Sequence, residues 1–313
     1  MISTNWLLNR HVLGALCAAP LLFSSASVFA GEAAPADAAP AAVEAAPPAA
    51  VEAAPAAPAE PAPPYTLTFN LGLYSNYMFR GVDYTDGPAL QGGADWAHSS
   101  GFYLGTWFSN LDQYGFGKIN GVQGGNKIET DFYGGYATTF GDSGFGINLL
   151  ANYYKYFNNK DSINGHRQDT LELSAALTYK WLTYTFFYIP TDYYGLDETD
   201  SNFNVTGNRN TDGATYNELK VNYTLPIGDL NFMAKVGYQH TPNLQGSEAD
   251  YAIGLNRNFS IPSGGKPIEG FNAGAYYTGT WAVKNEGFYT YATNGGTRDA
   301  NEDKLWFYVK RTW

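Results

Sequence analysis

The stretch Leu305-Trp-Phe-Tyr-Val-Lys-Arg-Thr-Trp313 decides the fold class. Its residues alternate in character: one parity holds Leu305, Phe307, Val309 and Trp313, and the other holds Trp306, Tyr308, Lys310 and Thr312. Arg311 breaks the apolar parity, so the rest of the chain has to support the assignment. In a soluble domain, an exposed half-apolar strand invites aggregation. In an outer-membrane barrel, the last strand closes the ring and its apolar face meets lipid. The stretch therefore predicts the C-terminal insertion strand of a transmembrane β-barrel.

Residues 1–30 have the pattern of a secretory signal peptide. Arg10 and His11 precede an apolar stretch at 12–23, and small residues lead to Val28-Phe29-Ala30. This pattern predicts cleavage between Ala30 and Gly31. An uncleaved membrane helix is one alternative, and the short apolar stretch disfavours it. A lipoprotein anchored through Cys17 is the other, and Leu16 disfavours it because it stands where lipidation requires a small residue.

The composition suits an exported barrel. Aromatic residues make up 16% of the chain, with 25 Tyr, and Gly numbers 35, as expected for a barrel with interfacial aromatic belts. The single cysteine lies in the predicted signal peptide, so we expect no disulfide, no cysteine metal site and no cofactor in the mature protein. No run of about 18 apolar residues follows the signal peptide, so we expect no transmembrane helix. The formal net charge of −11 argues against nucleic acid as a partner.

Residues 31–64 consist almost entirely of Ala, Pro and acidic residues. The heptapeptide at 41–47, Ala-Ala-Val-Glu-Ala-Ala-Pro, repeats at 49–55. Recurring prolines prevent helix propagation, and the segment has too few large apolar groups to offset its chain entropy. We expect a disordered periplasmic spacer. It is either an inert tether or an acidic arm that meets a partner.

From Tyr65 to Trp313 the chain changes to period-two alternation, which predicts strands. The alternating segments number about twelve, which predicts an all-β, antiparallel, up-and-down transmembrane barrel. They lie at 65–73, 90–96, 102–108, 128–140, 145–153, 171–179, 182–189, 218–225, 230–238, 251–255, 271–277 and 305–313.

The connections between these segments alternate in length. Tight joints are expected at 99–101, 141–144, 180–181 and 226–229, with a somewhat longer one at 262–270. Long polar joints are expected at 76–88, 111–126, 158–168, 190–213, 240–249 and 279–302. An even-stranded barrel with both termini in the periplasm predicts this alternation. Aromatic residues gather near the tight joints and predict the inner-leaflet girdle: Trp96, Phe102, Phe140, Phe145, Tyr179, Tyr223, Phe259, Phe271 and Trp313.

A segment of about 40 residues, 73–112, carries a family resemblance. It contains Asn76-Tyr-Met-Phe-Arg-Gly-Val82, Thr85-Asp-Gly87, Gln91-Gly-Gly93 and His98-Ser-Ser-Gly-Phe-Tyr-Leu-Gly-Thr-Trp107. This segment resembles the TorF family of putative outer-membrane porins, and the likeness extends more loosely over 65–313. The resemblance implies a pore in the outer membrane and supplies no catalytic residues.

The polar parity of the strands is expected to face the lumen. Rings of charge bias which ions pass, so the charged residues on this parity are selectivity candidates: Asp95, Glu129, Asp131, Glu172, Glu218, Lys220, Lys235 and Lys310. Mutual neutralisation is the alternative, because Glu218 and Lys235 lie on neighbouring strands and could pair. Five aromatic residues on the same parity predict a narrow bore: Tyr103, Trp107, Tyr133, Tyr154 and Trp306.

Arg80 lies where the first strand meets the first long loop. It is expected at the mouth of the barrel, where two interpretations are open. It could fold over the mouth, pair with Asp83 or Asp86 and meet incoming anions. A plain surface salt bridge is the alternative.

An enzymatic site has little support in the sequence. A serine hydrolase needs a Ser activated by His, and outside the predicted signal peptide the chain has only His98, His166 and His240. An omptin-like protease would draw on His240 with three loop aspartates, Asp192, Asp197 and Asp200. No Gly-rich phosphate loop and no metal-ligand spacing appears.

The sequence as a whole predicts three segments: a signal peptide (1–30), a spacer (31–64) and an outer-membrane barrel (65–313). The expected function is passive diffusion of ions or small solutes through a narrow lumen of mixed charge. The expected partners are outer-membrane lipid, the barrel assembly machinery and the solutes themselves. Two alternatives remain: a plugged structural or receptor barrel that acts through its outer loops, and an outer-membrane hydrolase.

Overall fold

The computed structural model describes residues 63–111, 127–157, 167–198, 206–208, 210–228, 230–244, 248–282, 290–293, 296–299 and 302–313, with backbone alone at 282, 290–293 and 296–299. The predicted signal peptide, its cleavage site between Ala30 and Gly31, and the spacer up to residue 62 lie outside the described residues, as do His166 and Asp200.

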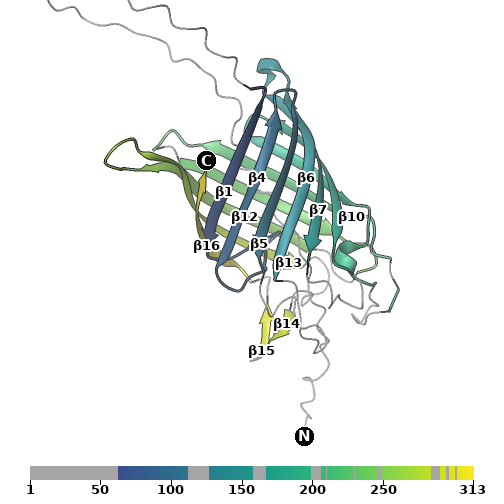
Figure 1. Cartoon of the computed structure of the whole chain (residues 1–313). Helices are drawn as coiled ribbons and strands as arrows, with labels where there is room; N and C mark the ends of the chain where they lie inside the picture. Colours follow the sequence, from purple (N-terminus) through teal and green to yellow (C-terminus); the bar gives the residue numbers. More distant parts are fainter. Residues whose placement is uncertain are drawn as a thin grey trace, which may run out of the picture. The chain divides into compact units, whose positions relative to one another are not determined.

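Twelve antiparallel strands form a closed barrel, as the alternation predicts (Figure 1). They are β1 (Tyr65–Tyr74), β4 (Ala89–His98), β5 (Phe102–Asn110), β6 (Ile128–Thr139), β7 (Phe145–Tyr156), β8 (Thr170–Tyr179), β9 (Leu182–Ile189), β10 (Ala214–Thr224), β11 (Leu230–His240), β12 (Glu248–Ile261), β13 (Ile268–Ala282) and β16 (Lys304–Thr312). Apart from the closing pair, β1 with β16, each barrel strand pairs with the next barrel strand along the chain.

The first and last barrel strands close the ring. β1 pairs with β16 in a register that sets Asn70 opposite Thr312 and Tyr74 opposite Tyr308. Phe69 and Trp313 exchange two backbone hydrogen bonds of 2.9 and 3.0 Å. Because both strands are paired on each side, the ring leaves no open sheet edge for lipid to meet. Closure by the C-terminal strand is therefore confirmed.

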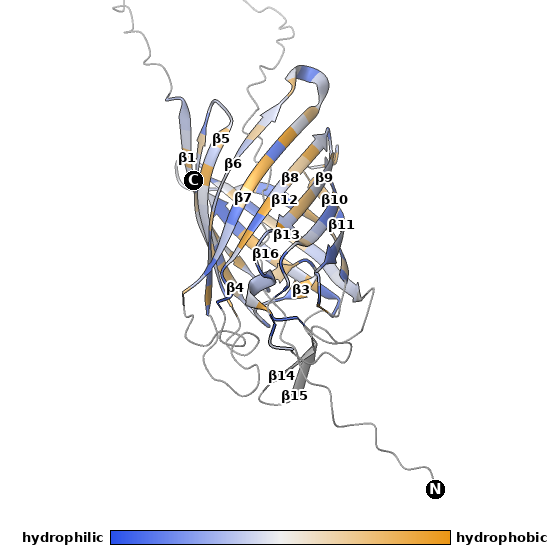
Figure 2. Ribbon diagram, turned by 90° about the vertical axis from the view of Figure 1, so that its right-hand side faces the viewer, coloured by the Kyte–Doolittle hydropathy of each residue, from blue (hydrophilic) through white to orange (hydrophobic). Residues whose placement is uncertain are grey.

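Hydrophobic and hydrophilic residues are interspersed along the strands of the barrel wall (Figure 2). Leu305, Phe307, Val309 and Trp313 point outward and are 41–56% exposed, whereas Trp306 on the other parity is 6% exposed. The same alternation runs through the other strands, and the large exposed hydrophobic side chains lie on the outward parity. An apolar outer face with a polar interior is the arrangement of a barrel that spans a membrane.

The connections differ in length at the two ends of the barrel, as predicted. The end with tight turns carries η1 (Gly141–Ser143) and the joints at 99–101, 180–181, 225–229 and 262–267. The opposite end carries the long loops, among them η4 (Tyr193–Gly195) and the hairpins β2 (Met78–Phe79) with β3 (Val82–Asp83) and β14 (Thr290–Thr293) with β15 (Gly296–Asp299). Within the described residues, no helix has the length and apolarity needed to cross a membrane.

Arg311 is a charged residue on the apolar, outward parity, and two aromatic residues at the tight-turn end accommodate it there. Its guanidinium carbon lies 5.3 Å from the centre of the Phe271 ring and 5.6 Å from that of Trp313. A long cationic side chain can cover apolar surface while its head reaches the interface, and aromatic faces attract it. The charge therefore fits an outward position at the rim.

Candidate functional site in the barrel lumen

The first long loop, residues 75–88, folds into the barrel and makes polar contacts with several strands of its inner wall. Its hairpin, β2 with β3, turns at Arg80 and Gly81, which have φ of 45° and 82°. The turn packs closely against β13: a Cβ on Gly81 would lie 2.6 Å from the Gly279 carbonyl oxygen and 2.2 Å from Thr280 Cγ2. Tyr77 and Asp83 are fully buried. This inner loop therefore occupies the lumen at its long-loop end.

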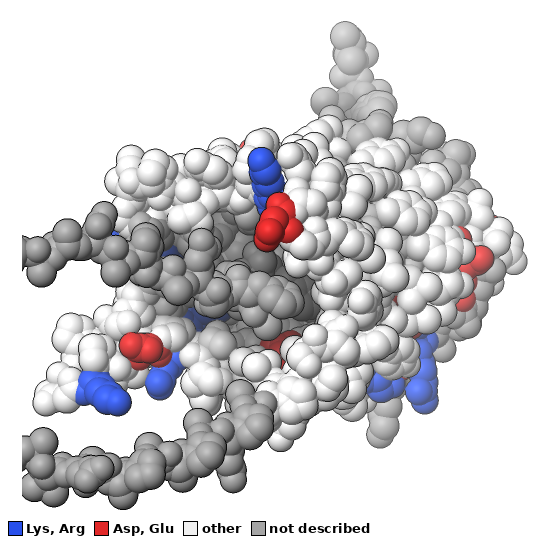
Figure 3. Space-filling view, turned by 90° about the horizontal axis from the view of Figure 1, so that it is seen from above, with Lys and Arg blue, Asp and Glu red and all other residues white. Residues whose placement is uncertain are grey.

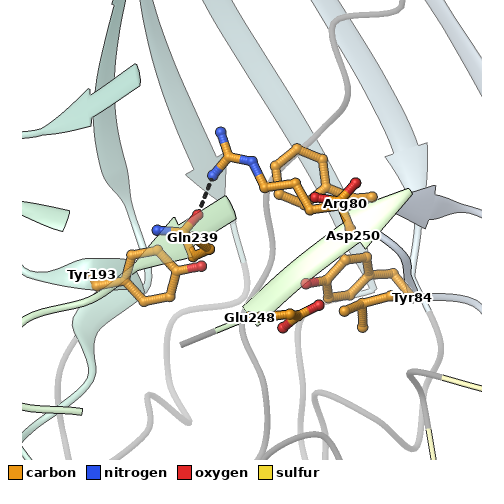
Figure 4. A pocket seen from close by; sticks show the side chains of 8 residues that line it. Arg80, Tyr84, Tyr193, Gln239, Glu248 and Asp250 are labelled. Atoms are coloured by element: carbon orange, nitrogen blue, oxygen red, sulfur yellow. Dashed lines mark hydrogen bonds between the residues drawn. The ribbon is translucent and has the colours of Figure 1, made fainter. Parts of the chain in front are cut away.

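Arg80 is the centre of the inner loop. Its Nη2 donates to Glu172 Oε2 on β8 at 2.8 Å. Its Nη1 donates to Gln239 Oε1 on β11 at 2.8 Å, the hydrogen bond drawn in Figure 4. The guanidinium carbon lies 3.9 Å from the centre of the Tyr216 ring and 5.0 Å from that of Phe187. Burial alone would lower the pKa of Arg80, but the Glu172 carboxylate opposes this, and the pKa lies well above its ordinary value. The guanidinium therefore stays charged.

These contacts correct the interpretation of Arg80 as a residue of a solvated surface salt bridge. The side chain is 7% exposed and its ion pair is with Glu172 inside the barrel. The physical reason is the inward fold of the loop, which carries the guanidinium to carboxylate and amide acceptors on distant strands. A planar guanidinium can donate to two different acceptors and lie over an aromatic ring at the same time, which suits arginine to this buried position.

Two further contacts anchor the inner loop to other parts of the wall. The Tyr77 hydroxyl donates to Glu129 Oε1 on β6 at 2.8 Å, and Tyr156 on β7 donates to Glu129 Oε2 at 2.7 Å. Asp83 forms an ion pair with Lys304 on β16 and accepts a hydrogen bond of 2.9 Å from Asn76. The inner loop thus spans the lumen from β6 to β16.

All eight predicted lumen residues lie on the inward parity of their strands. Glu218 and Lys235 form the anticipated pair, at 3.1 Å between Nζ and Oε2. Lys235 also pairs with Asp250 at 3.1 Å, and Lys220 with Glu218 at 3.4 Å. Mutual neutralisation therefore describes this part of the wall. Whether the eight residues set ion selectivity stays a prediction.

The remaining acidic candidates lie on the opposite wall. Asp95 accepts a hydrogen bond from Tyr133, and Asp131 accepts one of 3.0 Å from Asn152. Glu129 and Asp131 have no exposed surface, and Glu172 is 4% exposed. Acidic groups thus gather on β4 to β8.

The five aromatic residues expected to narrow the lumen are all on the inward parity. Tyr103 donates to Asn148 at 2.6 Å and Tyr154 to Glu172 at 3.0 Å. Trp107 packs edge-on against Tyr77 of the inner loop, and Trp306 stacks on Tyr276 with ring centres 5.0 Å apart. They fill space by contacting the wall and the inner loop.

Charge is distributed unevenly over the lumen. Among the described strand residues on the inward parity, β4 to β8 carry four acids and no base: Asp95, Glu129, Asp131 and Glu172. β10 to β16 carry three acids and four lysines: Glu218, Glu248, Asp250, Lys220, Lys235, Lys304 and Lys310. Seven acids against four lysines leave a net charge of −3, and the two walls differ in sign. Seen from the tight-turn end, the barrel is hollowed and few charged side chains appear at its rim (Figure 3).

Several residues of the site escaped prediction: Tyr77, Tyr216, Gln239, Asp250 and Lys304. Four of them are on the inward parity at the long-loop ends of their strands, so extending the alternation by a few residues would have placed them in the lumen. Tyr77 lies in a loop, and no periodic signal identifies its position.

Of the three histidines considered for a hydrolase, the two within the described residues, His98 and His240, lie at opposite ends of the barrel. His98 Nδ1 lies 2.7 Å from Ser100 Oγ within the tight turn, at the end opposite the inner loop. His240 is exposed at the end of β11, and Asp197 is buried. In the part of the chain that the structure describes, no group of three or more His, Cys, Asp or Glu side chains is placed to hold a metal ion.

Solved outer-membrane proteins are among the structures similar to this chain. The KdgM porin is 8% identical, with 79% of this chain and 99% of that chain covered, at a TM-score of 0.44. OccAB4 of Acinetobacter baumannii is 14% identical, with 79% and 56% covered, at a TM-score of 0.35. OprD of Pseudomonas aeruginosa is 12% identical, with 79% and 66% covered, at a TM-score of 0.36. No curated protein matches the sequence.

One family model covers the whole barrel. Residues 58–313 match the family described as "Bacterial protein of unknown function (Gcw_chp)". The match begins shortly before β1 and includes the inner loop, all twelve barrel strands and the closing strand. The chain therefore belongs to this family.

Proposed function

We propose that the chain is an outer-membrane channel through which ions and small solutes diffuse passively. The observation that carries the proposal is a closed barrel whose outer face is apolar and whose inner face is charged and partly hollow. A charged, hydrated interior costs free energy to build inside a membrane protein and is used where polar solutes pass. The inner loop is the constriction of this channel.

The lumen charge favours cations. The wall carries a net charge of −3, and the two buried charged residues of the inner loop, Arg80 and Asp83, cancel each other. Charge rings of one sign raise the local concentration of the opposite ion. The acidic wall of β4 to β8 faces lysines on the other wall, so a passing ion experiences a field across the lumen as well as along it. The candidates Asp95, Glu129, Asp131, Glu172, Glu218, Lys220, Lys235 and Lys310 set this field.

The proposal includes an orientation and the partners that follow from it. The tight turns lie in the periplasm with both chain termini, and the long loops and inner loop lie at the cell surface. Outer-membrane lipid contacts the apolar face, and the barrel assembly machinery engages β16 through Leu305, Phe307, Val309 and Trp313. The proposal also includes membership of the TorF porins, which is supported by the resemblance over residues 73–112. That segment contains the inner loop.

Planar bilayer recording tests the proposal. Purified protein is expected to give steady ohmic steps, with a reversal potential in a salt gradient that indicates cation preference. Repeated recordings without steps, from protein shown to be folded by its heat-modifiable migration on gels, would contradict it. Anion preference would contradict the assignment of selectivity to the acidic wall, but it would not contradict the proposal that the protein is a channel.

A plugged barrel is the second candidate, because the inner loop is buried and bonds to β6, β8, β11 and β16. In that case the long loops would carry the function. The same recording separates the two: silence in the natural protein together with steps in a variant whose inner loop is released favours the plug.

A further inference from the structure

The interface of β6 and β7 in the lumen holds two buried oxygen atoms that the described structure leaves without a hydrogen-bond partner. They are Asp131 Oδ1 and Asn152 Oδ1. Both side chains are almost completely buried, at 0% and 1% exposure. They lie together, because Asn152 Nδ2 donates to the other carboxylate oxygen, Asp131 Oδ2, at 3.0 Å. The hydrogen bond between Asn152 and Asp131 therefore has an acceptor oxygen on either side of it, and neither oxygen receives a donor.

The charge of Asp131 is also unbalanced. Among the described residues it forms no ion pair. The guanidinium of Arg80 is engaged by Glu172 and Gln239. A buried carboxylate without a paired cation or a full set of donors costs several kcal/mol, and buried polar atoms almost always have a partner. Something positive is therefore expected beside it.

The neighbouring groups make the site more attractive to a cation. Glu129 lies two positions from Asp131 on the same face of β6, and Glu172 is the register partner of Asn152 on β8. Glu129 is held in place by the hydroxyls of Tyr77 and Tyr156. The field of Glu129 adds to that of Asp131, because the interior screens charge less than water does, whereas Arg80 largely offsets the charge of Glu172.

We propose that Asp131 Oδ1 and Asn152 Oδ1 bind one singly charged cationic group, either a monovalent metal ion or the ammonium group of a small solute. One carboxylate and one amide oxygen balance a single charge and match the oxygen preference of alkali cations and ammonium donors alike. Glu129, which accepts a hydrogen bond from Tyr77 of the inner loop, lies two positions from Asp131 on the same face of β6, so the site is near a contact that holds the loop. The inference goes beyond the proposed channel, because occupancy does not require conduction.

The test measures the thermal unfolding of the full chain in detergent micelles by circular dichroism. Potassium chloride and methylammonium chloride are compared with choline chloride at equal ionic strength, since choline is too large for a buried site and offers no N–H donor. A ligand that binds only the folded state raises the melting temperature with its concentration. We expect a saturable rise with potassium, methylammonium or both. The salt that produces the rise identifies the metal ion or the ammonium group as the occupant.

Asp131→Asn keeps the shape and removes the charge, and it is expected to abolish the rise. Asp169→Asn is the matched control: Asp169 already pairs with Lys155 outside the lumen, so the rise should persist in this variant. If Asp131→Asn fails to fold, Asn152→Ala serves in its place. Equal melting temperatures in the three salts, as a proton on Asp131 would give, overturn the proposal. A rise that survives both lumen substitutions overturns it as well. Conductance is not measured here, so a failure of the channel proposal remains separate.

Discussion

Arg80 and Glu172 lie 92 residues apart in the sequence and form an ion pair of 2.8 Å inside the barrel. The pair joins the inner loop to β8, on the far side of the lumen from the strands that hold the loop. Because both side chains are buried, the loop cannot leave the lumen without separating a guanidinium from a carboxylate.

Arg80→Ala should therefore release the inner loop. Removing one partner of a buried ion pair costs about 3–5 kcal/mol, because the remaining carboxylate is left uncompensated. We expect a larger single-channel conductance and more frequent transitions between levels, measured in planar bilayers. Arg311→Ala is the control, since that arginine lies on the outer face. An unchanged conductance in Arg80→Ala would show that the loop is not the constriction.

Gly81→Ala tests the same loop by shape. An added Cβ would meet the Gly279 carbonyl oxygen and Thr280 Cγ2 at distances that no real contact shows. We expect the hairpin to move away from β13 and the conductance to rise. Gly87→Ala is a matched control in the same loop, because Gly87 also has a positive φ but open space around it. If Gly87→Ala raises the conductance as much as Gly81→Ala does, the rise comes from backbone strain at a positive φ and not from the contact with β13.

Tyr77→Phe removes one hydroxyl and retains the ring. The lost hydrogen bond goes to the charged Glu129, and such bonds contribute about 1.5–3 kcal/mol. The expected result is a smaller effect than that of Arg80→Ala, seen as a modest rise in the fraction of time spent at high conductance. Tyr184→Phe, whose hydroxyl bonds to Asn217 on the outer face, should behave like the natural protein.

Glu129→Gln combined with Asp131→Asn should reduce cation preference. The two substitutions keep side-chain shape and take two negative charges from the acidic wall, so the net charge of the whole lumen changes from −3 to −1. The reversal potential in a salt gradient is expected to shift toward the anion value. Replacement by lysine at both positions should shift it further in the same direction. No shift in either variant would remove these two residues from the selectivity role.

The apolar face provides a prediction about stability. Leu149→Arg places a charge in the middle of β7 on the outward parity, where Leu149 is 50% exposed. Such a charge costs about 2–4 kcal/mol at the centre of a bilayer and about 0–1 near its edge. Phe157→Arg, one residue beyond the end of β7 and also exposed, is the control. Urea unfolding in lipid vesicles should therefore rank Leu149→Arg well below Phe157→Arg in free energy of unfolding.

The barrel was largely predictable because its signal is local. Alternation in segments such as 305–313 assigns each residue to a face, and the pair of Glu218 with Lys235 follows from two neighbouring strands. The inner loop was not predictable in the same way. Arg80 bonds to residues 92 and 159 positions away, and Lys304 lies 221 positions from Asp83. A polar loop with a glycine turn resembles any surface loop until the ring of strands around it is known. Only the closed wall supplies the acceptors that draw Arg80 inward.

The seam between β1 and β16 has a consequence for how the molecule is made. Its hydrogen bonds, such as those between Phe69 and Trp313, join the two ends of the barrel sequence. Bringing such distant segments together carries a large loop-closure entropy, and contacts of long sequence separation form slowly. We therefore expect the zipping of this seam to be the slow step of folding, with the ten intervening strands already paired when it occurs.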